Sequence, residues 1–197
     1  YGFAVTNGLK KTMNADFQSI ITTGHSCTVV AVVKTIEKVL KELELRIGNL
    51  TLAVAGFGSI GQASINLLLS EIGEPAQIII ADLATQIPGL QKTLNDLKER
   101  FPNPVEVIPV DKIVPDEFYT ADIIIGASSN GKVLDVSKFR PGTILVDDSF
   151  PPVVDAKKAI LRMKNEMDVI FVGAGKLDVG KKERVIIQNA VPESWIR

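Results

Sequence analysis

The sequence predicts an α/β domain, a doubly wound parallel sheet of about six strands with an extra helix on its N-terminal side. Six short apolar runs lack polar alternation, which is typical of strands covered on both faces. Amphipathic stretches or short connections separate these runs, as in a sheet flanked by helices. The predicted strands are residues 50–55, 78–81, 105–110, 121–126, 143–146 and 169–172.

The predicted helices are recognised by apolar residues that recur at spacings of three and four. The strongest pattern covers residues 29–43, and lysines and glutamates occupy its other side. Further helices are predicted at residues 59–72, 86–100 and 154–165, each between two predicted strands. This alternation of strands and helices is what a doubly wound sheet requires.

The composition excludes several classes of function. The chain has 197 residues, of which 46% are hydrophobic, and 22 Lys and Arg stand against 23 Asp and Glu. This balance disfavours a dedicated nucleic-acid binder, and no apolar run reaches the roughly 18–20 residues that span a membrane. One cysteine and one histidine exclude an internal disulfide and a four-cysteine zinc site. We therefore expect no metal, no nucleic acid and no membrane span.

A glycine-rich loop follows the first predicted strand and precedes a helix. It reads Gly56-Phe57-Gly58-Ser59-Ile60-Gly61. Gly56 permits a tight turn, Gly58 lets the backbone approach a pyrophosphate, and Gly61 lets the helix pack close to the strand. The helix N-terminus adds N–H groups that attract an anion. The loop is therefore predicted to bind the pyrophosphate of a dinucleotide.

An aspartate, Asp82, ends the second predicted strand, 21 residues after Gly61. Its carboxylate can accept hydrogen bonds from both hydroxyls of the adenosine ribose and repels a 2′-phosphate, so the sequence favours NAD over NADP. A glycine-rich turn with an incidental surface aspartate is one alternative. An S-adenosylmethionine-dependent methyltransferase is another, although such enzymes usually carry an acid just ahead of the glycines, where this chain has Ala53-Val54-Ala55.

The ends of the later strands also carry candidate ligand residues. Ala127-Ser128-Ser129 follows the fourth strand, where small side chains leave room for a ligand and the strand order reverses. The fifth strand ends in Asp147-Asp148-Ser149 and the sixth in Gly173, and both ends are expected on the nicotinamide side. Two adjacent aspartates suggest a metal or acid–base site. Without a third ligand, a polar loop is the favoured interpretation.

The only histidine and the only cysteine lie in the segment Thr22-Thr23-Gly24-His25-Ser26-Cys27-Thr28, ahead of the long helix. A thiol beside a helix N-terminus can act as a nucleophile, so Cys27 and His25 are candidate catalytic residues. A buried structural cysteine is the alternative. Thr22, Thr23 and Gly24 are expected near the nicotinamide end of the cofactor, with hydroxyls that bind the ligand.

Several of these motifs together resemble a known group of enzymes, the cyanobacterial long-chain acyl-(acyl-carrier-protein) reductases. The likeness covers residues 20–175, and shikimate dehydrogenase and glutamyl-tRNA reductase are wider relatives. It implies a Rossmann-type fold, a nicotinamide cofactor, and a small-molecule or acyl-carrier-bound substrate such as an aldehyde or acyl thioester. It rests on Thr22-Thr23-Gly24 with Thr28, the long helix, the glycine-rich loop, Ile144-Leu145-Val146-Asp147 with Pro151, and Val172-Gly173-Ala174-Gly175.

The chain departs from this group at two places. The reductases use NADPH and place an arginine where Asp82 stands. Their catalytic cysteine follows the sixth strand, whereas residues 188–197 contain none. The lysine and aspartate pair of shikimate dehydrogenases has no counterpart either. We therefore expect substrate groups outside this chain.

The sequence thus predicts the cofactor domain of an NAD(P)-dependent oxidoreductase, which exchanges a hydride with a carbonyl or hydroxyl substrate. Residues 1–48 form a lead-in segment and the long helix, and residues 49–197 form the dinucleotide-binding domain. The start at Tyr1 without a signal-peptide pattern predicts a cytoplasmic piece of a longer chain. A homo-oligomer, formed if the long helix packs on a partner, is left open. A non-catalytic NAD-sensing module is the alternative function.

Overall fold

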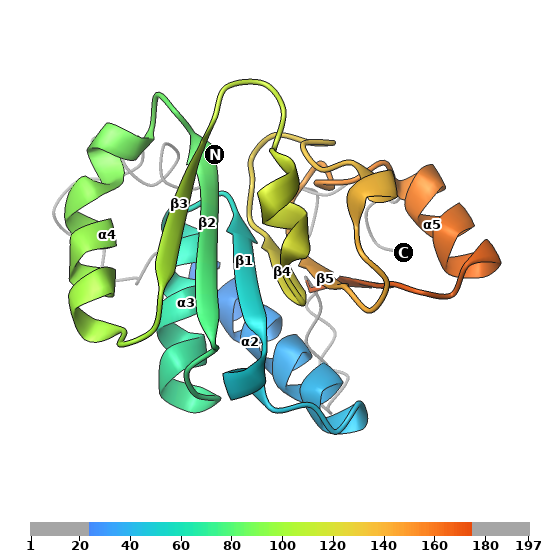
Figure 1. Ribbon diagram of the computed structural model, residues 1–197, viewed down its shortest axis with the longest axis horizontal. Coiled ribbons are helices and arrows are strands. Elements are labelled where there is room, and N and C mark those ends of the chain that lie inside the picture. The colour runs from blue at the N-terminus through green and yellow to red at the C-terminus, as the bar shows by residue number, and fades with distance from the viewer. Residues whose placement is uncertain (1–23, 175–197) are drawn as a thin grey trace, which may run out of the picture.

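The computed structural model describes residues 24–174. Within this range six strands form one parallel sheet in the order β3-β2-β1-β4-β5-β6 (Figure 1). In chain order the elements, with η for 3₁₀ helices, are α2 (His25–Glu42), η1 (Ile47–Asn49), β1 (Thr51–Ala55), α3 (Ser59–Glu71), β2 (Gln77–Leu83), α4 (Ile87–Arg100), β3 (Val105–Val110), η2 (Asp116–Thr120), β4 (Ile123–Gly126), η3 (Val136–Lys138), β5 (Ile144–Asp147), α5 (Ala156–Asn165) and β6 (Ile170–Gly173).

The strand order confirms the predicted doubly wound sheet. β1 lies in the middle, parallel to β2 on one side and to β4 on the other, and Val54 is the partner of both Ile80 and Ile125. The chain moves outward through β2 and β3, returns to β4, and then moves outward through β5 and β6. The direction reverses between β1 and β4, which is where such sheets open a crevice at the carboxyl ends of their strands.

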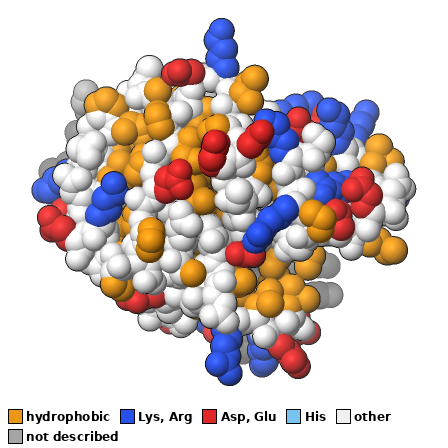
Figure 2. Space-filling model, in the orientation of Figure 1, with side chains coloured by type: hydrophobic (Ala, Val, Ile, Leu, Met, Phe, Trp, Pro, Cys, Tyr) orange, Lys and Arg blue, Asp and Glu red, His pale blue; other side chains and the backbone are white. Residues whose placement is uncertain are grey.

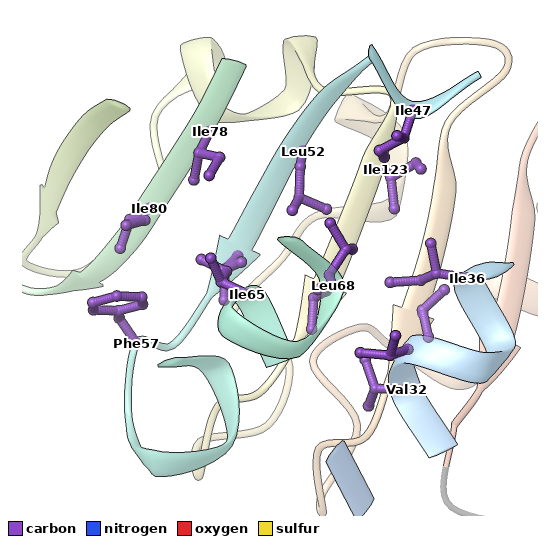
Figure 3. Packing of buried hydrophobic residues seen from close by; sticks show 14 of the residues in the cluster. Val32, Ile36, Ile47, Leu52, Phe57, Ile65, Leu68, Ile78, Ile80 and Ile123 are labelled. Carbon is purple, nitrogen blue, oxygen red and sulfur yellow. The ribbon is translucent and has the colours of Figure 1, made fainter. Parts of the chain in front are cut away.

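Three helices, α2, α3 and α4, cover one face of the sheet (Figure 1). Alternate strand residues such as Leu52 and Ile78 are apolar and fully buried on this face, and Val32 and Ile36 of α2 join the same cluster (Figure 3). Full burial of one such side chain stabilises the fold by about 1.5–3 kcal/mol. The helix that precedes β1 therefore contributes side chains to the hydrophobic core on this face of the sheet.

The opposite face is covered by η2, η3 and α5. Four aromatic rings pack edge to face there, with successive centroids 5.5–5.9 Å apart, namely those of Phe118, Tyr119, Phe139 and Phe171. The connection from β3 to β4 holds only η2, in agreement with the short connection predicted. On this face basic and acidic side chains are interspersed, and hydrophobic side chains are visible over β2 and β3 (Figure 2).

The long helix begins earlier than predicted. α2 starts at His25 and ends at Glu42. Gly24 adopts a left-handed φ of 78° and turns the chain into the helix, and the Thr28 N–H donates to the Gly24 carbonyl. The prediction that the histidine and Cys27 precede the helix is therefore wrong, because they form its first turn.

α2 runs opposite to the strands. Its C-terminal end leads through η1 to Thr51, the first residue of β1 at the amino edge of the sheet. In Figure 3, Val32 lies toward the carboxyl ends of the strands and Ile47 toward their amino ends. The 18 residues of α2 span about 27 Å, enough to follow the strands along their whole length. The first turn of α2 therefore lies at the carboxyl edge of the sheet, the edge at which doubly wound sheets bind their ligands.

A buried arginine on α5 forms hydrogen bonds to the connection between β4 and β5. Arg162, which is 9% exposed, donates to the carbonyl oxygens of Val136 and Phe139 and to both carboxylate oxygens of Asp168. These hydrogen bonds from Arg162 lower the pKa of Asp168. One side chain thus links η3, α5 and the segment that enters β6.

Candidate functional site

Two loops meet at the carboxyl edge between β1 and β4. The Ala127 N–H donates to the Ala55 carbonyl, so the turn after β4 begins beside the loop after β1. A Cβ atom on Gly56 would lie 2.7 Å from the Ala127 oxygen and 3.0 Å from the Ser128 Cα. Only glycine permits this close approach. The structure thus brings the glycine-rich loop, residues 56–61, against the small-residue turn.

The three glycines of the loop have different surroundings. Gly56 has a left-handed φ of 97°. A Cβ atom on Gly61 would lie 2.2 Å from the Gly56 oxygen, so α3 can approach the loop only with glycine there. A Cβ atom on Gly58 would meet no atom of residues 24–174 within 4 Å, its chain neighbours aside. The space in front of Gly58 is therefore open, and a ligand can approach its backbone closely.

α3 begins directly after this open position. Gly58 is the N-cap residue, no side chain in the described part of the chain caps the helix, and its first turn carries no acidic residue. The N–H groups of Ser59 and Ile60 belong to the first turn, where an α-helix offers no acceptor of its own. These donors and the positive end of the helix dipole suit an anion.

Phe57 anchors the loop in the protein. Its ring is 2% exposed and lies close to Ile80 in the core (Figure 3). Its N–H donates to Asp82 Oδ2 at 2.6 Å. Both the side chain and the N–H of Phe57 are therefore turned toward the protein, so it shapes the loop and its amide is already occupied.

Asp82 lies at the carboxyl end of β2, beside the loop. Its Oδ1 accepts from the Leu83 N–H at 2.7 Å, in addition to the bond from Phe57 to Oδ2. Each carboxylate oxygen has a second lone pair, and the side chain is only half-buried. The carboxylate can therefore accept hydrogen bonds from two further donors, the number that a ribose diol offers.

A second polar cluster joins the ends of β4 and β5. The Asp147 carboxylate accepts from the N–H groups of Ser149 and Val153, each at 2.9 Å. The Ser128 N–H donates to Ser149 Oγ at 3.0 Å, which ties the two turns together. Burial raises the pKa of Asp147, and hydrogen bonds from the two N–H groups oppose the shift. This carboxylate fixes a turn, in line with the polar-loop interpretation.

The next residue, Asp148, interacts with the first turn of α2. Its N–H donates to the Gly126 carbonyl at 3.0 Å. Burial, and then the charge of Asp147, raise the pKa of Asp148, whereas the charge of His25 lowers it. The histidine therefore lies within electrostatic reach of this carboxylate at the end of β5. Cys27, in the same helical turn, is exposed.

The remaining predicted residues are placed as follows. Ser129 is exposed, and Gly173 ends β6 beside Asp147 in the sheet. Thr22 and Thr23 lie outside the described residues. Within residues 24–174 no group of three or more His, Cys, Asp or Glu side chains is arranged to hold a metal ion.

One residue beside the loop, Gln62, was not predicted from the sequence to have a role at the site. Gln62 follows Gly61 directly, and its Nε2 donates to the Phe57 carbonyl at 2.8 Å. The signal available in the sequence was its position: a long polar side chain in the first turn of α3 can reach back into the preceding loop.

Solved structures share this architecture. L-tryptophan dehydrogenase from Nostoc punctiforme matches with a TM-score of 0.52 and 14% identity, over 76% of this chain and 41% of its own. Shikimate 5-dehydrogenase from Listeria monocytogenes, solved with shikimate and NAD, has a TM-score of 0.50 and 12% identity, over 73% and 52%. Δ1-Pyrroline-2-carboxylate reductase from Thermococcus litoralis, solved with NADH and L-proline, has a TM-score of 0.50 and 14% identity, over 64% and 37%. The chain has a Rossmann fold.

At such low identity, these likenesses establish the Rossmann fold alone. The chain spans about half or less of the length of each of these proteins. The predicted relation to shikimate dehydrogenase is confirmed at the level of the fold. No protein-family model matches the chain, and a search of curated proteins found no relative. The resemblance to acyl-(acyl-carrier-protein) reductases stays a prediction. None of the described helices is both long and apolar enough to cross a bilayer.

Proposed function

We propose that the chain is the NAD-binding domain of an oxidoreductase. The observation that carries this proposal is the open space in front of Gly58, at the start of α3, with Asp82 at the end of the neighbouring strand. A dinucleotide needs close backbone approach for its pyrophosphate, N–H donors for the charge, and a carboxylate for its ribose. One dehydrogenase and one reductase of similar fold were solved with NAD and NADH, respectively, which supports this class of cofactor.

Each residue of the loop has a separate part in the proposal. The N–H groups of Gly58, Ser59 and Ile60 bind the pyrophosphate, because the Phe57 N–H is already donated to Asp82. Gly56 and Gly61 permit the close packing that shapes the loop. Asp82 accepts from the ribose hydroxyls and repels a 2′-phosphate, so we propose a preference for NAD over NADP.

The nicotinamide end of the cofactor is assigned to the crevice beyond β1 and β4. The nicotinamide ring, when bound, exchanges a hydride with a carbonyl or hydroxyl carbon. The chain orients the ring and shields it from water, and His25 and Cys27 lie at the same edge of the sheet as candidates to hold a proton. The residues assigned to this side are Gly24, Ala127, Ser128, Ser129, Ser149 and Gly173, together with Thr22 and Thr23.

The substrate belongs to the same proposal. It is a small molecule or an acyl chain on a carrier, as an aldehyde or thioester, and part of its pocket lies outside residues 49–197, the proposed dinucleotide-binding domain. The matched part covers only 52% and 41% of two solved chains of similar fold, which supports a separate substrate-binding part.

Calorimetry of the chain with NADH, NADPH and S-adenosylmethionine in parallel tests the proposal. We expect NADH to bind more tightly than NADPH, and S-adenosylmethionine not to bind. Binding of S-adenosylmethionine alone would indicate a methyltransferase, and no binding of either nicotinamide cofactor would refute the proposal. Oxidation of NADH by the full-length protein with a panel of aldehydes and ketones then separates an enzyme from an NAD sensor, which binds without turnover.

A further inference from the structure

The residue that follows the glycine-rich loop makes hydrogen bonds to both carbonyl groups that lead into α3. The Gln62 side chain donates from Nε2 to the Phe57 oxygen at 2.8 Å, and its backbone N–H donates to the Gly58 oxygen at 3.0 Å. Two successive carbonyl oxygens are thus directed to the same residue, inside the first turn of the helix.

The direction of these carbonyl groups matters because the C=O and the N–H of a peptide group point in opposite directions. An anion at a loop is stabilised by N–H groups that point to it and is repelled by any carbonyl oxygen that points to it. The backbone N–H of Gln62 holds the Gly58 carbonyl in the ordinary helical pattern. No backbone donor of the helix does this for the Phe57 carbonyl, which lies one residue ahead of the N-cap. The Gln62 side chain supplies that donor.

The other groups of Phe57 are fixed independently. The ring is buried in the core and the N–H is donated to Asp82. When Nε2 of Gln62 is removed, the Phe57–Gly58 peptide loses the contact that holds its oxygen, although the ring and the N–H of Phe57 remain anchored. The affected peptide also carries the N–H of Gly58, the residue whose Cβ position is open.

We propose that Gln62 is a positioning residue for the dinucleotide, which turns the Phe57 carbonyl away from the pyrophosphate and the Gly58 N–H toward it. This inference rests on the proposed function, because it assigns the pyrophosphate to the loop. The side chain of Gln62 acts through the peptide group and makes no contact with the reacting atoms.

The test compares three variants of the full chain. Gln62→Ala removes the donor, and Gln62→Glu keeps the length of the side chain but replaces the amide with a negative charge at the helix N-terminus. Gln91→Ala is the matched control, since Gln91 is exposed on α4 and hydrogen-bonds only Asn95 among the described residues. Each variant is titrated by calorimetry with NADH, ADP, adenosine and inorganic pyrophosphate, and its melting temperature is measured.

We expect Gln62→Ala to weaken the binding of NADH, ADP and pyrophosphate by about five- to tenfold, the usual effect of one hydrogen bond. Gln62→Glu should weaken them further, because its carboxylate repels the anion. The affinity for adenosine, which has no phosphate, should not change in either variant. The control should bind all four probes as the wild type does.

Three results would overturn the inference. Unchanged binding of the phosphate-bearing probes by both variants would show that the carbonyl needs no such contact. An equal loss for adenosine, or a collapse of the melting temperature, would show that Gln62 only supports the fold. Failure of the wild type to bind any phosphate-bearing probe would reject both proposals. If the wild type binds pyrophosphate but not NADH, only the proposed function fails, and the pyrophosphate titrations still decide the role of Gln62.

Discussion

The Asp147 carboxylate lies against the backbone of Gly126, where β5 and β4 end side by side. A Cβ atom on Gly126 would lie 2.4 Å from Asp147 Oδ1 and 3.0 Å from a methyl group of Val153. The absence of a side chain at Gly126 makes room for a carboxylate that in turn binds the N–H groups of Ser149 and Val153. One glycine outside the glycine-rich loop therefore decides how the ends of β4 and β5 pack against each other.

The first prediction concerns this glycine. Gly126→Ala should destabilise the fold by about 1–3 kcal/mol, the usual cost of overpacking a tight site, as measured by urea denaturation. Gly89→Ala in α4 is the control, because a Cβ atom there would meet no other described part of the chain within 4 Å. It should be neutral or stabilise by up to about 1 kcal/mol. Equal effects of the two substitutions would contradict the contact described above.

The second prediction separates folding from binding at the loop. Gly58→Ala places a methyl group in open space, so the melting temperature should stay within about 2 °C of the wild type, as for a change of under 1 kcal/mol. The same methyl group stands where the pyrophosphate is proposed, so the affinity for NADH should fall at least about tenfold, or 1.4 kcal/mol. An unchanged affinity for NADH in folded Gly58→Ala would show that the pyrophosphate does not bind at Gly58.

The third prediction concerns cofactor choice. Asp82→Ala should weaken NADH binding more than NADPH binding, by about 1–3 kcal/mol, because hydrogen bonds to a charged group are lost. It also removes the acceptor of the Phe57 N–H, which disturbs the loop for both cofactors. Asp82→Asn keeps one acceptor oxygen without the charge. It should therefore make the affinities for NADH and NADPH more alike, with a smaller loss of affinity for either cofactor than in Asp82→Ala. An equal loss of affinity for both cofactors in Asp82→Ala would contradict the assignment of Asp82 to the ribose.

The fourth prediction follows from the pair formed by Arg162 and Asp168. Because the hydrogen bond from Arg162 lowers the pKa of Asp168 below its ordinary 3.8, folding favours the ionised carboxylate. This ionised carboxylate stabilises the folded state fully when the pH is above the ordinary pKa of an aspartate. The stabilisation is lost as the pH falls through the lowered pKa of Asp168 in the folded protein. Thermal melts from neutral pH to about pH 2 should therefore show Asp168→Asn less stable than the wild type at neutral pH, with the difference shrinking in acid. Asp96→Asn, at an exposed position of α4, should show no such trend.

The fifth prediction concerns the end of α2. The charge of His25 lowers the pKa of Asp148 against burial and the charge of Asp147, which raise it. His25→Gln should therefore raise the pKa of Asp148 further, as measured by carbon NMR of its carboxyl group. Lys41→Gln, at the opposite end of the same helix, should leave it unchanged. A fall or no change in His25→Gln would place the histidine away from β5.

The sheet could be predicted from the sequence because a strand covered on both faces is apolar at nearly every position. Ile78 to Ala81 and Ile123 to Ile125 are buried without exception, so no alternation obscures the strands. The start of α2 could not be predicted in the same way. His25 and Cys27 face partly outward and add nothing to the apolar pattern, and only the left-handed turn at Gly24 shows where the helix begins.

The site could be predicted only where it depends on local sequence. The loop and the aspartate at the carboxyl end of β2 are recognised by spacing. The hydrogen bond from Phe57 to Asp82, in contrast, joins residues 25 positions apart and appears only when β1 and β2 pair. The proximity of His25 and Asp148 depends likewise on the direction of α2 across the sheet. Contacts between distant segments are set by packing, which the pattern of one segment does not contain.

The central position of β1 has a consequence for hydrogen exchange. Leu52, Ala53 and Val54 are fully buried and the strand is paired on both sides, so their amide protons exchange only when most of the domain opens. β3 and β6, at the two ends of the described sheet, exchange through smaller openings. The glycine-rich loop continues directly from the slowest-exchanging strand. A dinucleotide held there would be detected as new protection at the loop, on top of a strand whose protection is already close to the limit set by global unfolding.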